Sequence, residues 1–199
     1  MTKFDPQKYV TIALSKDAGR GPLQHIYRDK TKLIGCDGYR FHMINELPAV
    51  ESPHFLLNDY VGQYPNYEAA LPASEKERYV GKILVSKNDM KRLKGLIGFI
   101  GTDKNPVVKM YRDEATHRHL QISYSSIFES LPHTAKITIE VEDTSIHLNF
   151  FKMGLKLKDL TEVLIEEQWM TVWVNPDMSS IIFRCDHLNT YGLLMACKL

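Results

Sequence analysis

Residues suited to contacting another molecule follow an Asp37-Gly38 pair, which lies between two short apolar runs, LI before it and HMI after it. Asp-Gly between strand-like segments predicts a tight turn, because glycine reaches positive φ without steric cost. The next residues are Tyr39, Arg40 and Phe41. Tyrosine offers a flat face with a polar tip, and arginine can pair with a carboxylate or a carbonyl. A structural role, with Phe41 in the core and Arg40 in an ion pair, fits the same residues, and the residue types alone favour it.

A second group of candidate residues lies in a predicted helix at 86–100. The apolar face of this helix is predicted to hold Met90, Leu93, Ile97 and Ile100. The opposite face carries three lysines and no acid, namely Lys87, Lys91 and Lys94. Ammonium groups on one exposed helix face would contact phosphates without reading bases. A stripe of merely solvated lysines is an equal alternative.

A second lysine cluster lies at the start of a later predicted helix, LKLKDLTEVLIEE. Its members are Lys152, Lys156 and Lys158. Three glutamates, Glu162, Glu166 and Glu167, follow them along the chain. This cluster therefore supports phosphate contact less well than the first helix does.

The bulk composition limits the function classes. The 199 residues hold 25 basic and 24 acidic side chains, and a net charge of +1 gives no global attraction to nucleic acid. The sequence has no glycine-rich phosphate loop or nucleophile elbow, and His117 and His119 lack a third metal ligand. We therefore expect no enzyme, no cofactor and no metal. Three cysteines without a CxxC pair, and no apolar run near the roughly 18 residues of a membrane span, predict a cytoplasmic protein with no membrane partner.

The predicted secondary structure repeats along the chain. A helix starts at Asp5-Pro6, and three strands follow it up to residue 47. Residues 48–72 form an irregular connection with at most a short strand in HFLL. From Val80, a strand, a helix and several strands occur twice in the same order, which indicates an internal repeat of roughly 60 residues. The stretch 5–47 is similar to a further, partial copy.

With its elements in this order, the sequence resembles the β sliding clamp family of bacterial DNA polymerase III. CDGYRF resembles the family's threonine-aspartate-glycine-histidine-arginine-leucine turn, and GQYPNYEAALP is similar to its glycine-x-phenylalanine-proline-aspartate-tyrosine…leucine-proline segment. SKNDMKRLKGLI takes the place of the first helix of the last domain, and LLMACKL resembles the apolar C-terminal run. Cys36, Tyr39 and Ala196 replace the family's threonine, histidine and proline.

The resemblance implies an α+β DNA clamp fold of repeated strand-helix-strands half-domains. Residues 80–199 would form one complete clamp-like domain, similar to the family's last domain. Residues 1–79 would form a reduced clamp-like domain, similar to part of the middle domain, because its second half-repeat is nearly absent.

The resemblance also implies a groove for short peptides, where the Asp-Gly turn, the leucine-proline segment and the C-terminus converge. Its apolar floor would consist of Phe41, Leu71, Pro72, Leu193, Leu194 and Met195, and methionine adapts to varied ligands. Tyr39, Arg40 and Phe41 would form a rim, with Cys36 and Cys197 nearby. In clamps, helices such as the one at 86–100 line the central channel, so its lysines would face duplex DNA.

These expectations describe a DNA polymerase processivity factor. It would encircle or lie along duplex DNA and bind peptide motifs of DNA polymerases or repair proteins. A clamp loader and further copies of the chain, in a homo-oligomer, are additional expected partners. The first alternative is a clamp-fold adaptor or decoy that binds partner peptides without forming a ring, and the second is an unrelated small enzyme.

Overall fold

The computed structural model describes residues 4–45, 47–48, 50, 54–56, 62–71, 79–99, 106–112, 119–125, 134–142, 152–175 and 177–197. Its helices are α1 (Pro6–Thr11), α2 (Lys87–Phe99) and α3 (Leu157–Val163), with 3-10 helices η1 (Ala18–Gln24) and η2 (Glu68–Ala70). Its strands are β1 (Ile26–Asp29), β2 (Lys32–Cys36), β3 (Arg40–Ile44), β4 (His54–Leu56), β5 (Tyr79–Leu84), β6 (Val107–Arg112), β7 (His119–Ser125), β8 (Thr134–Glu142), β9 (Lys152–Lys156), β10 (Trp169–Val174), β11 (Ser180–Cys185) and β12 (Thr190–Met195).

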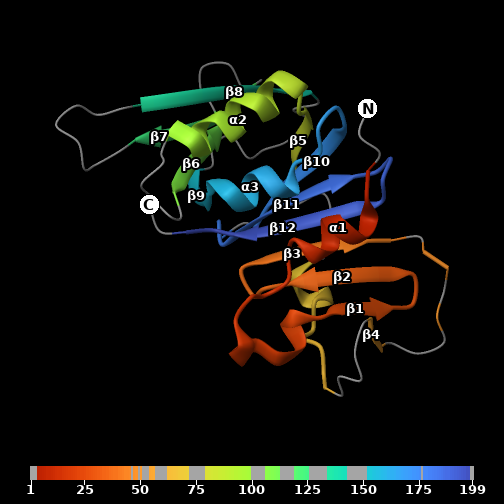
Figure 1. The fold of residues 1–199 in the computed structure, drawn as a ribbon. Coiled ribbons are helices and arrows are strands. Elements are labelled where there is room, and N and C mark those ends of the chain that lie inside the picture. The colour runs from red at the N-terminus through yellow and green to blue at the C-terminus, as the bar shows by residue number, and fades with distance from the viewer. Residues whose placement is uncertain are drawn as a thin grey trace.

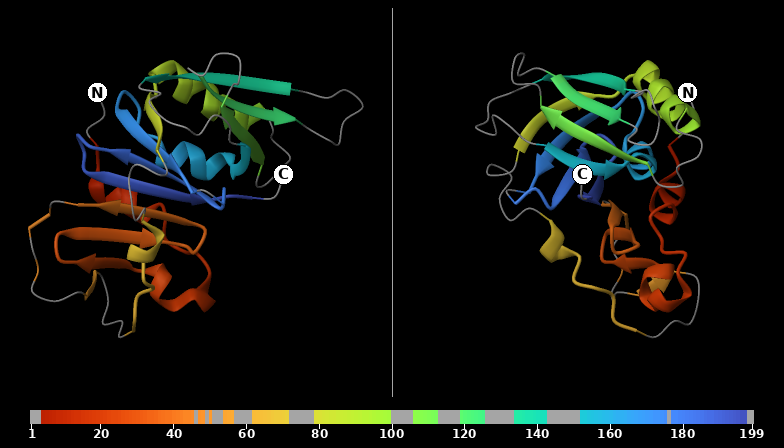
Figure 2. Two further views of the ribbon diagram at one scale, coloured as in Figure 1. Left: turned by 180° about the vertical axis from the view of Figure 1, so that it is seen from behind. Right: turned by 90° about the vertical axis from the view of Figure 1, so that its left-hand side faces the viewer.

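These strands form one 12-stranded sheet in the order β4-β1-β2-β3-β12-β11-β10-β5-β8-β7-β6-β9 (Figure 1). The three α-helices lie along one side of it, as the right-hand view of Figure 2 shows. We call this side the helix face and the opposite side of the sheet the outer face. Alternate residues of each strand point to one face or the other.

The predicted repeat is present in the second part of the chain. The order β5-α2-β6-β7-β8 is followed by β9-α3-β10-β11-β12. The first strand of each half-repeat pairs with a strand of the other: β5 pairs with β10, and β9 pairs with β6. A single bridge between Gly154 and Cys197 also joins β9 to the chain just after β12.

The first part of the chain contains one half-repeat, and its described residues include no strand before α1. It consists of α1, η1 and the antiparallel strands β1, β2 and β3. The short strand predicted in HFLL is present as β4, and it pairs with β1 just as β9 pairs with β6. Between β4 and β5, the described residues 62–71 contain η2 and no strand.

The apolar clusters differ between the two parts. The largest cluster takes its buried members from Val80 to Leu194 only. A second cluster joins Phe41 and Ile34 to Trp173 and Leu193 across the β3–β12 pairing. The first part of the chain therefore completes its core against the second part.

Two helix predictions need correction. On α2, Met90, Leu93 and Leu96 are buried, whereas Ile97, predicted on the buried face, is exposed, because the core-facing stripe continues three residues after Leu93 rather than four. Ile100 lies outside the described residues. The later helix is shorter than predicted at both ends. Leu155 and Lys156 belong to β9, which pairs with β6, and the backbone becomes extended at Leu164, so the helix ends at Val163.

Candidate functional site

The Asp37-Gly38 pair forms the predicted tight turn between β2 and β3. Gly38 has a φ of 88°, in the left-handed region where glycine carries no Cβ penalty. Asp37 Oδ1 accepts hydrogen bonds from the backbone N–H groups of Tyr39 and Arg40, each at 2.9 Å. The aspartate therefore fixes the point at which β3 begins and so the face to which each of its side chains points.

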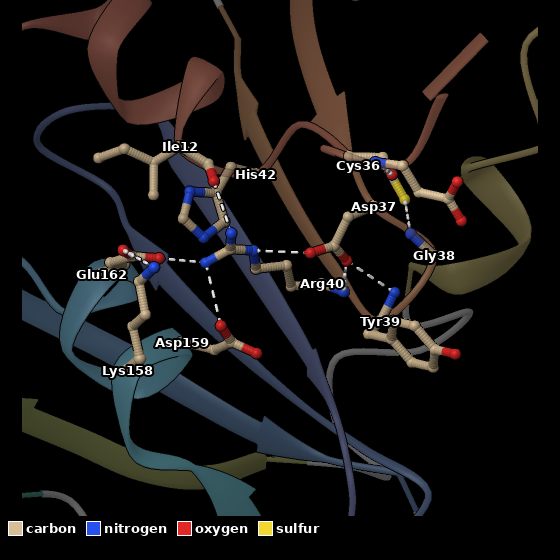
Figure 3. A network of polar contacts seen from close by, with 12 residues as sticks. Ile12, Cys36, Asp37, Gly38, Tyr39, Arg40, His42, Lys158, Asp159 and Glu162 are labelled. Carbon is tan, nitrogen blue, oxygen red and sulfur yellow. Dashed lines mark hydrogen bonds and ion pairs between the residues drawn. The ribbon is translucent and has the colours of Figure 1, made fainter. Parts of the chain in front are cut away.

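Arg40 lies where the first part of the chain meets the second, and its side chain is only 9% exposed. Nε donates to Asp37 Oδ2 at 3.0 Å, and Nη2 donates to the carbonyl oxygen of Ile12 at 2.7 Å. Nη1 donates to Asp159 Oδ1 at 3.0 Å and also to Glu162 (Figure 3). One guanidinium thus joins the end of α1, the β2–β3 turn and α3.

The surroundings of Arg40 hold more negative than positive charge. Three carboxylates contact this guanidinium, and Lys158 Nζ lies 3.9 Å from Glu162. Burial raises the pKa of the Asp159 carboxyl although Arg40 beside it acts to lower that pKa. The structure therefore places Arg40 inside an ion network rather than at a groove rim, as in the structural alternative considered from the sequence.

The alternation along β12 separates two residues predicted to share one apolar floor. Phe41 and Leu193 are register partners and are buried together on the outer face. Leu194 points to the helix face and packs in the core of the second part of the chain. Leu193 and Leu194 therefore cannot line the same groove, because neighbouring residues of a strand face opposite sides.

The exposed apolar surface at this junction comes from Tyr39 and Met195, which are 53% and 41% exposed. The Met195 N–H donates to the Tyr39 carbonyl oxygen at 2.8 Å, so the two residues lie opposite each other. Cationic groups of Arg20 and Lys156 lie 4.8 and 4.9 Å from the centre of the Tyr39 ring. We call these four residues the junction patch.

The remaining predicted groove residues are less accessible. Cys36, Leu71 and Cys197 are half-buried. Burial raises the pKa of the Cys36 thiol, which disfavours the reactive thiolate. The Cys197 N–H donates to the carbonyl oxygen of Gly154 at 2.8 Å. Pro72 lies outside the described residues.

Two tyrosines that were not predicted as site residues cover part of the expected floor. Tyr64 and Tyr67 are buried on the outer face. The Tyr67 ring stacks on Phe41 with 6.0 Å between ring centres, and its hydroxyl donates to Asp29 at 2.5 Å. The available signal was the pair of tyrosines in YPNY, inside an otherwise polar connection.

The lysines of α2 lie as predicted, since Lys87, Lys91 and Lys94 are all exposed. A Cβ added at Gly95 or Gly98 would meet no described atom within 4 Å. Both glycines therefore lie at open surface on the helix that carries the lysines. The second cluster is divided differently, as Lys152 and Lys158 are exposed, whereas Lys156 is half-buried over Tyr39. These three do not form one helix stripe, because two of them belong to β9.

A buried histidine attaches α1 to the same region. His42 Nδ1 donates to the Tyr9 carbonyl oxygen at 2.7 Å, and the two rings stack 4.4 Å apart. Gly192 lies opposite His42 on β12, and a Cβ there would come within 1.8 Å of Val163 Cγ2. A glycine is therefore required where α1 and α3 approach the sheet. Burial lowers the pKa of His42 to about 4.

The fold is shared with solved bacterial sliding clamps. The Caulobacter crescentus pol III beta structure matches with a TM-score of 0.72 and 12% identity, over 98% of this chain and 63% of that one. The Thermotoga maritima DNA polymerase III beta subunit matches with 0.71 and 14% identity, over 96% of this chain and 62% of that one. The Helicobacter pylori beta clamp bound to a DNA ligase peptide matches with 0.66 and 16% identity, over 100% and 68%.

These likenesses confirm the predicted clamp fold and its shortened form. The chain spans less than two thirds of the length of the Caulobacter and Thermotoga proteins. No family model matches the sequence, and no curated protein matches it. Among the described residues, no helix is long and apolar enough to span a membrane.

We predict that Arg40→Met lowers the free energy of unfolding by about 3 kcal/mol, because it removes a buried cation and leaves three partly buried carboxylates without it. The matched control is Lys158→Met, which removes a cation that is 58% exposed at the same network and should cost less than about 1 kcal/mol. Urea unfolding followed by circular dichroism measures both. Equal losses in the two variants would contradict a structural role for Arg40.

A second prediction concerns the pH dependence of stability. Because the pKa of His42 is lowered in the folded state, its contribution is complete above the unfolded value near 6.5 and is lost as pH falls toward 4. The free energy of unfolding should therefore fall by up to about 3 kcal/mol over this window from His42 alone. His42→Asn, which keeps a donor near the position of Nδ1, should remove this component. Parallel pH profiles for wild type and variant in urea unfolding would refute it.

Proposed function

We propose that the protein is a sliding-clamp-like processivity factor of DNA replication, without catalytic activity of its own and acting in the cytoplasm. It encircles or lies along duplex DNA with its helix face and binds short peptide motifs of DNA polymerases or repair proteins at the junction patch. A clamp loader would place it on DNA. The observation that carries the proposal is the exposed lysine stripe of α2 on the helix face of a clamp fold.

The helix face suits contacts with phosphates rather than bases. Lys87, Lys91 and Lys94 project from one helix and have long, flexible side chains. Such groups neutralise phosphates and release counterions, which gives binding without sequence preference and with strong salt dependence. Gly95 and Gly98 add no side chain that would hold DNA away from this surface.

The junction patch suits a short peptide. Tyr39 and Met195 offer adjacent apolar side chains, and methionine adapts its shape to varied ligands. Arg20 and Lys156 beside them can pair with an acidic residue or a terminal carboxylate of the peptide. Phe41 and Leu193 support the patch from below rather than touching the peptide, because both are buried.

The alternative function is an adaptor that binds partner peptides without closing a ring. The organisation of the chain favours it. The proposed reduced domain at 1–79 consists of one half-repeat, and this half-repeat packs against the complete domain proposed at 80–199. Both edges of β12 already carry partners, namely β11 and β3. If the copies in a ring were joined by pairings like that of β3 with β12, each copy would need another strand equivalent to β12 with an unpaired edge.

We predict that exchanging Lys87, Lys91 and Lys94 for glutamate abolishes binding to a short duplex, because the variant repels phosphates. For wild type, each phosphate contact should contribute about −0.9 to the slope of log affinity against log salt. Fluorescence anisotropy at several salt concentrations measures both quantities. The control exchanges Lys16, Lys30 and Lys82, which are exposed elsewhere, for the same change in net charge. Equal loss in both triple variants would contradict a specific helix-face contact.

We also predict micromolar affinity, about −8 kcal/mol, for a fluorescent peptide of five or six residues rich in leucine and phenylalanine. Met195→Asp should weaken binding at least tenfold, because it places a charge against an apolar anchor. Leu84→Asp is the matched control, since Leu84 is comparably exposed on β5. Wild type that fails to bind at several hundred micromolar would exclude the patch as a peptide site.

A further inference from the structure

Two methionines are exposed among the described residues, and the remaining described methionines are buried. Met178 and Met195 are 36% and 41% exposed. The buried methionines are each at most 3% exposed, namely Met43, Met90, Met110, Met153 and Met170. The sulfur of Met170 also accepts a hydrogen bond from the Ile165 N–H at 3.4 Å. An oxidant in solution therefore has access to the two exposed side chains in the folded chain, and the core shields the other five.

The two exposed methionines lie at the same end of the sheet. Met195 is the last residue of β12, and it pairs with Ser180 at the start of β11. The Ala196 N–H donates to the Ser179 carbonyl oxygen at 2.8 Å, which continues this pairing toward Met178. Met178 has a φ of 57° and belongs to the turn that precedes β11. The two accessible sulfurs are thus brought together by the β11–β12 pairing.

Met195 is also the residue of this pair that belongs to the junction patch. Strand alternation directs its side chain to the outer face, as it does that of Leu193. Its N–H donates to the Tyr39 carbonyl oxygen, which fixes its backbone beside the exposed tyrosine. A modification of the Met195 side chain therefore changes the apolar part of the junction patch directly.

Oxidation of a thioether reverses the property that suits it to an apolar ligand. Methionine is flexible and apolar, whereas methionine sulfoxide is polar and chiral and carries a strong acceptor oxygen. A peptide that buries this oxygen against its own apolar side chain would remove its hydrogen bonds to water without replacing them. The oxidised patch should therefore bind an apolar peptide less tightly.

We propose that Met195 is a site of reversible oxidation by hydrogen peroxide, and that its sulfoxide weakens peptide binding at the junction patch. The effect on binding rests on the proposed peptide-binding function, whereas the oxidation itself does not. Peroxide is the oxidant because it needs only access to the sulfur. The reverse reaction is that of methionine sulfoxide reductases, which use a thiol as reductant.

The chemical step involves the sulfur and one peroxide molecule. A sulfur lone pair attacks one peroxide oxygen, so that an S–O bond forms while the O–O bond breaks. The departing hydroxide takes the proton of the transferred oxygen, which gives methionine sulfoxide and water. The sulfur is oxidised by two electrons, and the peroxide is reduced by the same two.

The test is a peroxide titration of the full chain in two measurements. Mass spectrometry of proteolytic fragments, without the ligand peptide, measures the oxidation rate of each methionine. We expect Met178 and Met195 to react at least tenfold faster than the five buried methionines. Fluorescence anisotropy measures binding of the peptide rich in leucine and phenylalanine, whose affinity should fall about tenfold after oxidation. The two reductases, one for each sulfoxide epimer, should restore it.

Three variants assign the effect to one sulfur. Met195→Leu should keep its affinity after peroxide, because leucine retains an apolar side chain of similar volume and has no sulfur. The matched control is Met178→Leu, which should lose affinity as wild type does. Met195→Gln should bind weakly before any peroxide, because its amide is polar like the sulfoxide. Protection by Met195→Leu would also exclude Cys36 and Cys197 as the cause, because this variant keeps both thiols.

Several results would overturn the proposal. These are buried methionines that react as fast as Met195, an affinity that oxidation of Met195 leaves unchanged, and protection by Met178→Leu instead of Met195→Leu. A circular dichroism spectrum that changes on oxidation would also do so, because the loss of affinity would then reflect unfolding. Reduced wild type that binds no peptide would refute the proposed function and the effect on binding, whereas the oxidation rates test the site separately.

Discussion

The desolvated guanidinium of Arg40 is the constraint on which the arrangement of the two parts of the chain depends. A buried ion costs several kcal/mol unless its partners are correctly placed, and the partners of Arg40 come from three separate segments. Asp37 belongs to the turn that starts β3, whereas Asp159 and Glu162 belong to α3 of the other part. Satisfying this one charge therefore fixes how β3 meets β12, and so fixes where Tyr39 and Met195 lie.

The sheet separates two surfaces of different chemistry. Lysines project from α2 on the helix face, and the aromatic cluster of Phe41, Tyr64 and Tyr67 occupies the outer face. Because strand residues alternate, a charged ligand on one face and an apolar ligand near the other can bind without competing. The junction patch lies at the start of β3 and the end of β12, beside the ion network. A partner bound there would contact residues next to the pairing that joins the two parts of the chain.

Sequence patterns predicted the elements that depend on local chemistry. The Asp-Gly turn, the helix start at Asp5 and the doubled order of elements after Val80 follow from φ preferences, capping and apolar periodicity. The residue types favoured an ion pair for Arg40, but neither its partners in α3 nor the burial of Leu194 on the helix face could be predicted. Both depend on which side of a strand faces a distant helix. Which residues of 62–71 pack against the sheet is likewise a long-range property, so the tyrosine pair in YPNY indicated burial without indicating contact between Tyr67 and Phe41.

The exchange of first strands between half-repeats explains the position of β4 in the sheet. β9 covers the edge of β6, and β5 covers that of β10, so each set of three strands receives its fourth strand from the other half-repeat. In the same way, the three residues of β4 pair with the edge of β1. Without β4, the backbone groups on this edge of β1 would be unpaired and could pair with strands of other chains. Among the described residues between Ile44 and Tyr79, β4 is the one strand that pairs with the first part of the chain, and its position matches that of the first strand of a half-repeat.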